Sequence, residues 1–291
     1  MLECVFTVGL PGSGKSYWAH NQSGYTVIDS DEVRETLWGD ASDQQNPNKV
    51  FETMFRQTCE ALAAGQSVIY CATNISMKYR IHTLTNLKRK FPNVYFSCVV
   101  FNTTVEKCKE MNRARERQVP EYVIERQFHS FQFPVNGEGW DDIKIYTPFK
   151  YSIKKFSKNI WEDVKGFGSQ DNPHHTLTLY NHLLATIDKV DLDKLNDTLT
   201  REQVLIAAGL HDIGKAYTRS YDDAGVAHYY SHAEVSAYLA MNFGAPQQVI
   251  EIVNYHMKPF DIGGASAWEK RLGSELWHKI MVLHEADVAA K

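Results

Sequence analysis

The pattern of hydrophobic and polar positions changes near the middle of the chain. In the first half, short β-branched and aromatic runs alternate with longer stretches of helical periodicity. The runs predict strands at 2–8, 27–28, 67–71 and 94–101, and the periodic stretches predict helices at 16–21, 32–38, 48–64 and 77–91. Alternating strands and helices are typical of a parallel sheet with helices on both faces. We therefore predict an α/β fold for the first half.

Beyond residue 168 the strand signals give way to apolar residues at helical spacing. The pattern predicts helices over 176–190, 201–210, 232–243, 247–255 and 267–290. We expect an all-α bundle here. The mixed, glycine-ended segment 151–168 is the predicted boundary region, and we place the domains at 1–155 and 156–291.

Composition supports this division. The chain has 291 residues, 43% of them hydrophobic, which is near the length at which one core gives way to two. The net charge of −4 divides into +2 for 1–155 (19 basic against 17 acidic residues) and −6 for 156–291 (12 against 18). All five cysteines lie in the first domain and nine of the 12 histidines in the second. The two halves therefore differ in chemistry.

We expect a cytoplasmic protein without membrane association. The cysteines show no CxxC spacing, which is typical of reduced thiols in the cytosol. No apolar run reaches the length of a transmembrane helix. Met1–Gly9 lacks the basic region and long apolar stretch of a signal peptide.

A GxxxxGKS phosphate loop lies between the first predicted strand and helix. Its backbone N–H groups can surround an anion, Lys15 can reach the β- and γ-phosphates, and the Ser16 hydroxyl can ligate Mg²⁺. The expected nucleotide contacts are Gly9, Gly12, Ser13, Gly14, Lys15 and Ser16. The alternative is a chance match in a structural turn, but the strand before the motif and the helix after it favour nucleotide binding.

Asp31 and Arg34 follow the second predicted strand. A carboxylate at this place can accept a proton from an attacking hydroxyl. Arg34 lies three residues further along the same helix face and can hold an acceptor phosphate. The alternative is a helix cap with a solvated first turn.

Residues 1–150 resemble the kinase domain of 5′-hydroxyl polynucleotide kinases. Besides the phosphate loop, the resemblance rests on four motifs: D-x-x-R at 31–34, T-N at 73–74, N-x-x-R at 112–115 and V-P-x-x-V-I at 119–124. It implies that Asp31 is the general base and Arg34 an acceptor contact. It also implies that Arg115 is the main lid residue over the ATP phosphates, with Arg113 and Arg117 as further lid candidates, and that Thr73 and Asn74 belong to the substrate site. Cys71 stands where relatives commonly carry an acidic residue.

The second half carries the motif Ala207-Ala208-Gly209-Leu210-His211-Asp212-Ile213-Gly214-Lys215. An adjacent His-Asp pair offers a nitrogen and an oxygen to one metal ion, which suits Zn, Mn, Fe, Ni or Co. The other candidate ligands lie within or directly after separate predicted helices, which a bundle must bring together; they are His182, His232, His256 and Asp287. The alternative for each histidine is an ordinary core or surface residue.

Residues 170–291 resemble the HD-domain metal-dependent phosphohydrolases through the series H…HD…H…H…D. The resemblance implies a principal metal site made of His182, His211, Asp212 and Asp287. It implies that His232 and His256 bind a second metal or the scissile phosphate. Lys215 either neutralises phosphate or caps its helix. We expect His175 to contact substrate, although His174 or His175 could replace His182 as the first ligand.

Together the halves resemble bifunctional end-healing enzymes. The resemblance implies phosphorylation of 5′-OH ends of RNA or DNA from ATP or another NTP with Mg²⁺. It also implies removal of 2′,3′-cyclic or terminal 2′- or 3′-phosphates with one or two divalent transition metals, and a ligase as functional partner. One alternative is a nucleoside or nucleotide kinase with an HD nucleotidase, which the acidic total charge favours. The other is a module that senses nucleotides without phosphoryl transfer, against which the intact Asp31 and Arg34 argue.

Overall fold

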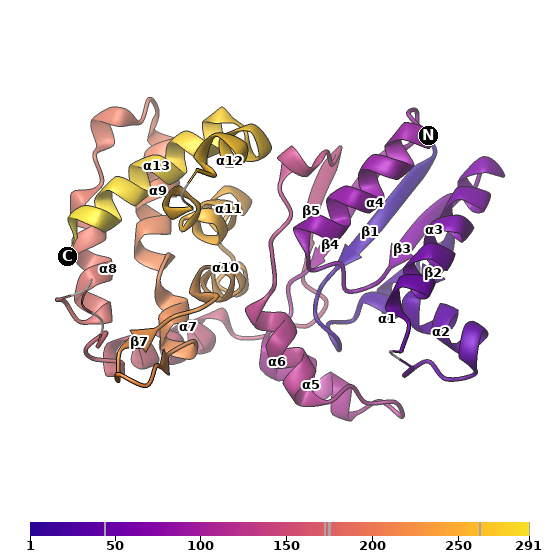
Figure 1. Cartoon of the computed structure of the whole chain (residues 1–291), viewed down its shortest axis with the longest axis horizontal. Coiled ribbons are helices and arrows are strands. Elements are labelled where there is room, and N and C mark those ends of the chain that lie inside the picture. Colours follow the sequence, from indigo (N-terminus) through magenta and orange to yellow (C-terminus); the bar gives the residue numbers. More distant parts are fainter. Residues whose placement is uncertain (44, 172, 174–175, 262, 291) are drawn as a thin grey trace. The chain divides into compact units, whose positions relative to one another are not determined.

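The computed structural model describes residues 1–291 except 44, 172, 174–175, 262 and 291 (Figure 1). The chain forms two compact units. The first comprises residues 1–127 and 134–149, and the second comprises residues 128–133 and 150–291. Each unit is described separately below.

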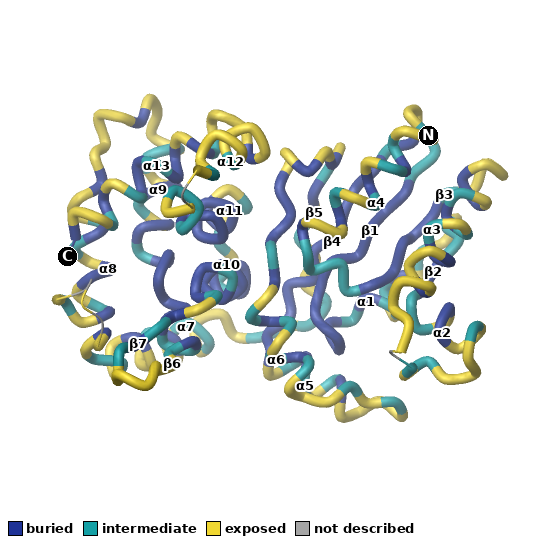
Figure 2. Tube along the Cα trace, in the orientation of Figure 1, coloured by how far each residue is buried: buried dark blue, intermediate teal, exposed yellow. Residues whose placement is uncertain are grey.

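The first unit is a five-stranded parallel sheet with the strand order β2-β3-β1-β4-β5. The strands are β1 (Glu3–Val8), β2 (Tyr25–Asp29), β3 (Ser67–Cys71), β4 (Tyr95–Phe101) and β5 (Asp142–Tyr146). The central strands β1 and β4 are dark blue along most of their length in Figure 2, because their side chains are buried on both faces. This explains why both strands are nearly continuous apolar runs.

Helices connect the strands of the first unit. They are α1 (Lys15–His20), α2 (Ser30–Trp38), α3 (Pro47–Ala63), α4 (Met77–Lys90), α5 (Val105–Arg113) and α6 (Glu121–His129), with a 3₁₀ turn at Asn136–Glu138. Several begin at side-chain caps: Asp29 caps α2, Asn46 caps α3 and Thr104 caps α5. The predicted α/β class is confirmed.

The sequence pattern missed strand β5. It pairs with β4 in parallel register, with Ser97 opposite Asp142. Only Ile143 of its five residues is buried, and its lysine and aspartate resemble loop composition. An edge strand of this kind gives a weak periodic signal, because it pairs with another strand on one side only and buries few of its side chains.

The second unit is helical. Its main elements are α7 (Ile153–Gly166), α8 (Leu179–Lys189), α9 (Thr198–Leu210), α10 (His232–Asn242), α11 (Gln247–Tyr255), α12 (Ala265–Leu272) and α13 (Ser274–Ala289). Three 3₁₀ turns lie at Leu192–Lys194, Ile213–Tyr217 and Lys258–Phe260. All residues of α10 except the half-buried Glu234 are buried, and this helix is mostly dark blue in Figure 2. The predicted helical bundle is confirmed.

Three details differ from the sequence expectations for this unit. The predicted boundary segment contains helix α7, whose buried residues Ile160 and Val164 stand one helical turn apart. The last predicted helix is divided into α12 and α13 at Gly273, which has a φ of 87°. A short antiparallel hairpin, β6 (Ser220–Tyr221) with β7 (Ala227–His228), interrupts the helices.

Residues 128–133, which comprise the last two residues of α6 and the segment after it, pack within the second unit. The Phe131 ring lies 4.9 Å from the Tyr238 ring, centroid to centroid. The Tyr255 hydroxyl donates a hydrogen bond of 2.8 Å to the Phe133 carbonyl. Nonlocal contacts of this kind leave no periodic signal in the sequence.

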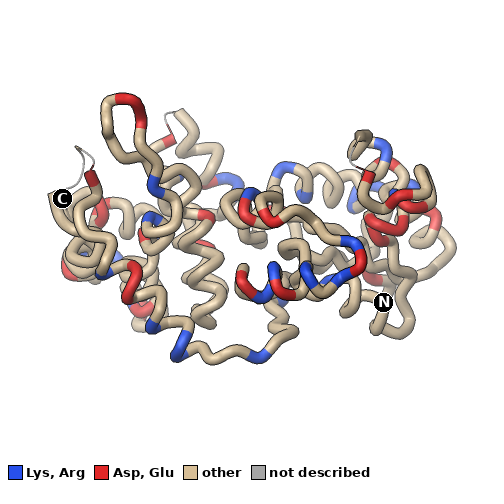
Figure 3. The backbone as a smooth tube through the Cα atoms, turned by 90° about the horizontal axis from the view of Figure 1, so that it is seen from below, with Lys and Arg blue, Asp and Glu red and all other residues tan. Residues whose placement is uncertain are grey.

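Charged residues of both signs lie next to one another in each unit in the view of Figure 3. None of the helices that the structure describes is both long and apolar enough to cross a membrane.

Candidate functional site

The phosphate loop joins the end of β1 to the start of α1, as predicted. Gly12 and Gly14 have φ values of 81° and 95°, a conformation that L side chains rarely adopt. A Cβ at Gly12 would lie 2.1 Å from the Cys108 carbonyl oxygen. The Gly9 N–H donates to the Thr73 carbonyl, at 2.9 Å. Glycine is therefore required at position 12 by both backbone angle and close approach.

Lys15 and Ser16 point into this loop region. The buried Lys15 amine donates to the Leu10 carbonyl, at 2.6 Å, and lies 3.3 Å from Ser13 Oγ. Burial lowers the pKa of Lys15. An amine that is buried beside a loop of backbone N–H groups is suited to binding phosphate oxygens.

Asp29 is a site residue that the sequence analysis missed. It is the last residue of β2 and is buried. Its Oδ2 accepts a 2.8 Å hydrogen bond from the Ser16 hydroxyl, and its Oδ1 accepts one of 2.8 Å from the Asp31 N–H. Cys71 is opposite Asp29 in the β2–β3 register, and its sulfur lies 3.8 Å from Ser16 Oγ. The position of Asp29 at the carboxyl end of a parallel strand was the signal by which the sequence could have identified it as a site residue.

Hydroxyl and carboxylate oxygens are the ligands that Mg²⁺ prefers. Ser16 and Asp29 place both kinds of oxygen together beside the phosphate loop. These two residues therefore fit a Mg²⁺ ion that is bound with a nucleotide.

Asp31 lies in the first turn of α2 and contacts two arginines. Its Oδ1 is 2.8 Å from Arg34 Nη1, and its Oδ2 is 2.8 Å from Arg117 Nη1. Arg34 also donates to the Ser30 carbonyl, at 3.2 Å. The predicted pair of Asp31 and Arg34 thus lies together, and Arg117 joins it from the segment after α5.

The segment 112–119, which carries the predicted lid arginines and is called the lid segment below, is held by the buried Asn112. Its side-chain amide donates to the Val119 carbonyl, at 2.7 Å, and accepts from the Val119 N–H, at 2.9 Å. Between these residues, Arg115 is close enough to Lys15 that its charge adds to the lowering of the lysine pKa by burial. Arg113 instead forms an exposed ion pair of 2.6 Å with Glu121.

Thr73 and Asn74 support the loop. Asn74 has a φ of 46°, and its side-chain amide donates to the Thr7 carbonyl at the end of β1, at 2.8 Å. The Asn74 carbonyl accepts a hydrogen bond of 2.8 Å from buried Arg80. The T-N motif thus connects the ends of β1 and β3 to the phosphate loop.

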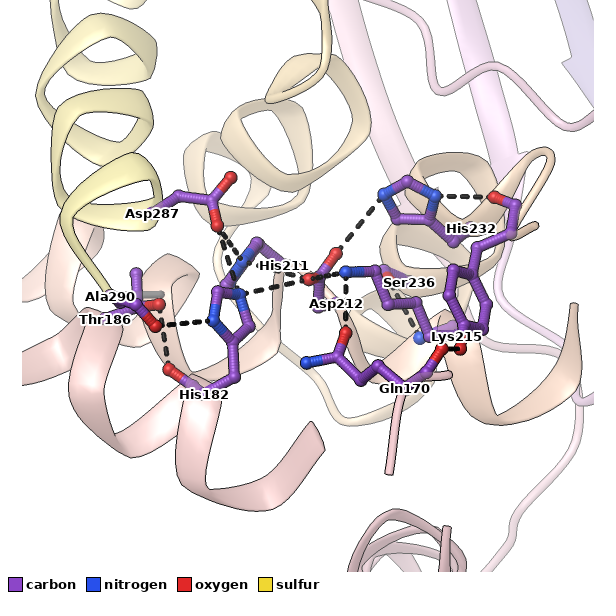
Figure 4. A network of polar contacts seen from close by, with 12 residues as sticks. Gln170, His182, Thr186, His211, Asp212, Lys215, His232, Ser236, Asp287 and Ala290 are labelled. Atoms are coloured by element: carbon purple, nitrogen blue, oxygen red, sulfur yellow. Dashed lines mark hydrogen bonds and ion pairs between the residues drawn. The ribbon is translucent and has the colours of Figure 1, made fainter. Parts of the chain in front are cut away.

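The second unit brings the predicted metal ligands together (Figure 4). Four ligand atoms, one from each residue, lie within 4.8 Å of one another in the first group; its members are His182, His211, Asp212 and Asp287. A second group has the same property; its members are Asp212, His232 and His256. The histidines come from α8 and from the junctions at the ends of α9, α10 and α11.

All four histidines are oriented through Nδ1. This atom contacts a backbone carbonyl in each ring, at distances of 2.7 to 3.2 Å; the partners are Ala290, Ala208, Tyr229 and Val253. A carbonyl only accepts, so Nδ1 carries the proton and Nε2 of the neutral ring keeps its lone pair. The backbone therefore fixes the tautomer in which each Nε2 faces the site.

Asp212 is shared by the two groups. Its Oδ2 lies 3.3 and 3.4 Å from Nε2 of His182 and His211, and its Oδ1 lies 3.2 and 3.6 Å from Nε2 of His232 and His256. Asp287 Oδ1 lies 3.1 Å from His182 Nε2. A carboxylate that presents one oxygen to each group is arranged to bridge two cations.

The charges favour a cation between these ligands. Burial lowers the pKa of His211, but the carboxylates of Asp212 and Asp287 outweigh it and raise the pKa to about 10. Burial lowers the pKa of His256 to about 4, so this ring is neutral at neutral pH. The Nε2 atoms of His232 and His256 lie 3.3 Å apart. Buried nitrogen lone pairs together with carboxylate oxygens fit a divalent transition metal.

Lys215 lies inside the metal-ligand cluster. Its amine is 2.6 Å from Asp212 Oδ2 and 3.0 Å from Gln170 Oε1. Gly214, before it, allows close packing, because a Cβ there would lie 2.3 Å from a backbone oxygen of α10. Gln170 is fully buried and was not anticipated. His175, the expected substrate contact, and its neighbour His174 lie outside the described residues.

Comparison with known proteins agrees with the two units. Residues 4–134 match the AAA domain family, and residues 174–290 match the HD domain family. A relative in Acanthamoeba polyphaga mimivirus, named for bifunctional polynucleotide phosphatase and kinase activity, is 27% identical over 175 residues. That match covers 56% of this chain and 36% of the relative, so it spans little more than a third of the relative's length.

Two solved structures show distant likeness. The Pnkp1/Rnl/Hen1 complex aligns with 22% identity and a TM-score of 0.32, covering 41% of each chain. A kinase-named protein of Chloroflexus aurantiacus aligns with 12% identity and a TM-score of 0.43, covering 57% of this chain and 97% of the other. Both TM-scores are below 0.5, so neither likeness bears on function.

The predicted combination of a phosphate-loop domain with an HD domain is thus confirmed by both family matches and by the fold of each unit. Residues 4–134 thus match the AAA domain family and residues 174–290 match the HD domain family, and we refer to the first unit as the AAA domain and to the second as the HD domain.

Proposed function

We propose that the protein heals broken polynucleotide ends. The AAA domain transfers the γ-phosphoryl group of ATP or another NTP to a 5′-hydroxyl end. The HD domain removes a 2′,3′-cyclic phosphate or a terminal 2′- or 3′-phosphate. The observation that carries the proposal is the contact of Asp31 with Arg34 near the start of α2. Asp31 lies two residues after Asp29, which accepts the hydrogen bond from Ser16. The Asp31 carboxylate, as the proposed base, and the Arg34 guanidinium, as the proposed phosphate contact, therefore lie together where the acceptor would bind.

In the kinase reaction, the phosphate loop and Lys15 bind the NTP phosphates, with Mg²⁺ held beside Ser16 and Asp29. Arg115 adds positive charge where negative charge develops during transfer. Asp31 accepts the proton of the 5′-hydroxyl as its oxygen bonds to the γ-phosphorus. The bond between this phosphorus and the β-phosphate oxygen breaks, and NDP leaves.

In the HD domain, the two groups of candidate ligands would hold the metal, with Asp212 common to both groups. A bound divalent metal supplies an activated water and stabilises the leaving oxygen. Lys215 holds its ammonium against Asp212 and offers a positive charge to the substrate phosphate. This chemistry serves cyclic and terminal phosphates alike, and its products are the ends that a ligase joins.

Domain-specific variants test the proposal. Lys15→Ala is expected to abolish phosphorylation of a 5′-OH oligonucleotide and to leave phosphate release from a 3′-phosphorylated or 2′,3′-cyclic end unchanged. Asp212→Ala is expected to do the reverse. Lys49→Ala and Asp223→Ala, at exposed positions, are matched controls. Loss of both activities in either folded variant would contradict the assignment of two separate sites.

The acceptor is tested with labelled ATP and Mg²⁺. We expect label transfer to 5′-OH oligonucleotides. Transfer to nucleosides or mononucleotides alone would replace the end-healing proposal by a monomer kinase with an HD nucleotidase, which the net charge of −4 favours.

A further inference from the structure

Two lid arginines of the AAA domain face different partners. Arg117 Nη1 lies 2.8 Å from Asp31 Oδ2, on the acceptor side of the site. Arg115, two residues earlier, is the lid arginine whose charge acts on Lys15 at the phosphate loop. The family resemblance treats Arg117 only as a further lid candidate for the NTP phosphates. The contact with Asp31 points to another role.

In the cluster of Asp31, Arg34 and Arg117, two guanidinium groups share one carboxylate as their ion-pair partner. The carboxylate of Asp29 also acts on the charge of Arg34, and that of Asp40 interacts with the charge of Arg117. The side chain of Arg34 is 9% exposed and that of Arg117 is 32% exposed. The Nε atoms of both are buried, and neither has a hydrogen-bond partner among the residues that the structure describes. Buried N–H donors without acceptors are costly, and paired guanidinium groups fit phosphate oxygens well. The cluster is therefore suited to one further anion.

Both oxygens of Asp31 are occupied in this arrangement. Arg34 occupies Oδ1 and is also held by the Ser30 carbonyl of the same helix. Arg117 occupies Oδ2 and approaches from the lid segment. A general base needs an oxygen within hydrogen-bond reach of the hydroxyl that it deprotonates. The contact with Arg117 is therefore the one that an incoming substrate can exchange.

We infer that Arg117 and Arg34 form a clamp for the phosphate on the 3′ side of the nucleotide that carries the accepting 5′-hydroxyl, and that this phosphate draws Arg117 away from Asp31. The freed Oδ2 then accepts the proton of the 5′-hydroxyl. The oxygen–phosphorus bond forms, the bond to the β-phosphate breaks, and the electron pair leaves with NDP.

Arg117 is thereby a specificity-determining residue, because only acceptors with that 3′-side phosphate release the base from its ion pair. Nucleosides lack the phosphate and meet an occupied carboxylate. This inference rests on the proposed function and refines it, since it says how the site distinguishes strand ends from nucleosides.

The test compares the wild type with Arg117→Gln, Arg117→Lys and a control, Arg56→Gln, in which the altered arginine forms an exposed pair with Glu60 on α3. Initial rates are measured with a 5′-OH oligonucleotide, a nucleoside 3′-phosphate and the parent nucleoside, and KM is measured for acceptor and NTP. Thermal unfolding confirms that each variant is folded. The control is expected to match the wild type.

For Arg117→Gln we expect kcat/KM with the two phosphate-bearing acceptors to fall roughly 10- to 100-fold, the range expected for one charge-assisted contact with phosphate. The KM for NTP stays within about twofold, and the rate with the nucleoside is unchanged or higher. Arg117→Lys keeps the positive charge but lacks the planar set of N–H donors of a guanidinium, so we expect an intermediate loss of kcat/KM.

Other outcomes overturn the inference. A raised KM for NTP with an unchanged acceptor KM would make Arg117 an NTP contact. An unchanged preference for oligonucleotide over nucleoside in Arg117→Gln would reject the clamp while leaving the proposed function intact. A wild type that phosphorylates nucleosides as fast as oligonucleotides would likewise reject the clamp alone, whereas a wild type that phosphorylates only nucleosides would reject the proposed function and the clamp together.

Discussion

Acid is expected to weaken metal binding by the HD domain steeply. A histidine must lose its Nε2 proton before that atom can bind a metal. The carboxylates of Asp212 and Asp287 outweigh burial and raise the pKa of His211 to about 10, so in the metal-free protein this ring stays protonated at neutral pH. His256, whose pKa burial lowers to about 4, is already neutral and gives no such competition. The metal therefore displaces at least one proton, that of His211.

One displaced proton sets the minimum magnitude, because Asp212 and Asp287 also outweigh burial at His182 and raise its pKa. Below the raised pKa, each unit of pH reduces the apparent association constant about tenfold, or about 1.4 kcal/mol. Going from about pH 8 to about pH 6 should therefore weaken Mn²⁺ or Zn²⁺ binding about 100-fold. Because the pKa is raised, the protonated state dominates on the acid side, and affinity rises with pH.

Competition with a chelating dye of calibrated pH dependence measures this slope. Calorimetry in buffers of different ionisation enthalpy counts the released protons independently. Affinities that differ less than about threefold over this range, with no proton release, would refute the assignment of His211 as a ligand in the field of the two carboxylates.

Three further substitutions test other parts of the structure. Glu138→Gln removes one charge from a fully buried ion pair of 2.6 Å with Arg80 and should destabilise the AAA domain by about 3–5 kcal/mol in denaturant unfolding, with the HD transition unchanged; equal shifts of both transitions would contradict separate units. Gln170→Leu removes the amide that holds the Lys215 amine and should lower kcat for phosphate release about tenfold at an unchanged metal affinity, whereas lost metal binding would show that Gln170 acts on the ligands. Gly214→Ala should shift the HD unfolding midpoint downward, since the added methyl would lie 2.3 Å from a backbone oxygen of α10; an unchanged midpoint would contradict that close approach.

Local chemistry explains what could be predicted from the sequence. The phosphate loop could be placed because its glycine positions, its lysine and its serine act within eight consecutive residues, between a strand and a helix. The class of each domain could be predicted because a buried parallel strand and an amphipathic helix have different periodicities. Strand β5 escaped because it lies at an edge and buries only Ile143.

The geometry of the HD site could not be derived from spacing. His182 and Asp287 are 105 positions apart in the numbering, yet their ligand atoms lie 3.1 Å apart. The resemblance to HD phosphohydrolases named the ligands, and the bundle explains their proximity. The shared use of Nδ1 depends on backbone carbonyls near helix ends, including those three residues before His211 and His256, whose positions are set by tertiary packing. Gln170 escaped for the same reason, because glutamine in a connecting segment carries no periodic or motif signal.

Aspartates at the two sites differ in a way that explains their different chemistry. Asp31 has a side chain that is 44% exposed, and both of its partners are arginines on separate elements, so a charged substrate can replace one of them. Asp212 is 3% exposed and is surrounded by four histidines whose rings are fixed by the backbone, which leaves its oxygens no solvent to exchange with. A carboxylate proposed to take up and release a proton in each turnover needs replaceable partners, whereas one proposed to bind a metal needs rigid ones. Burial and the identity of the neighbouring side chains, rather than residue type, therefore separate the proposed base from the proposed ligand in this chain.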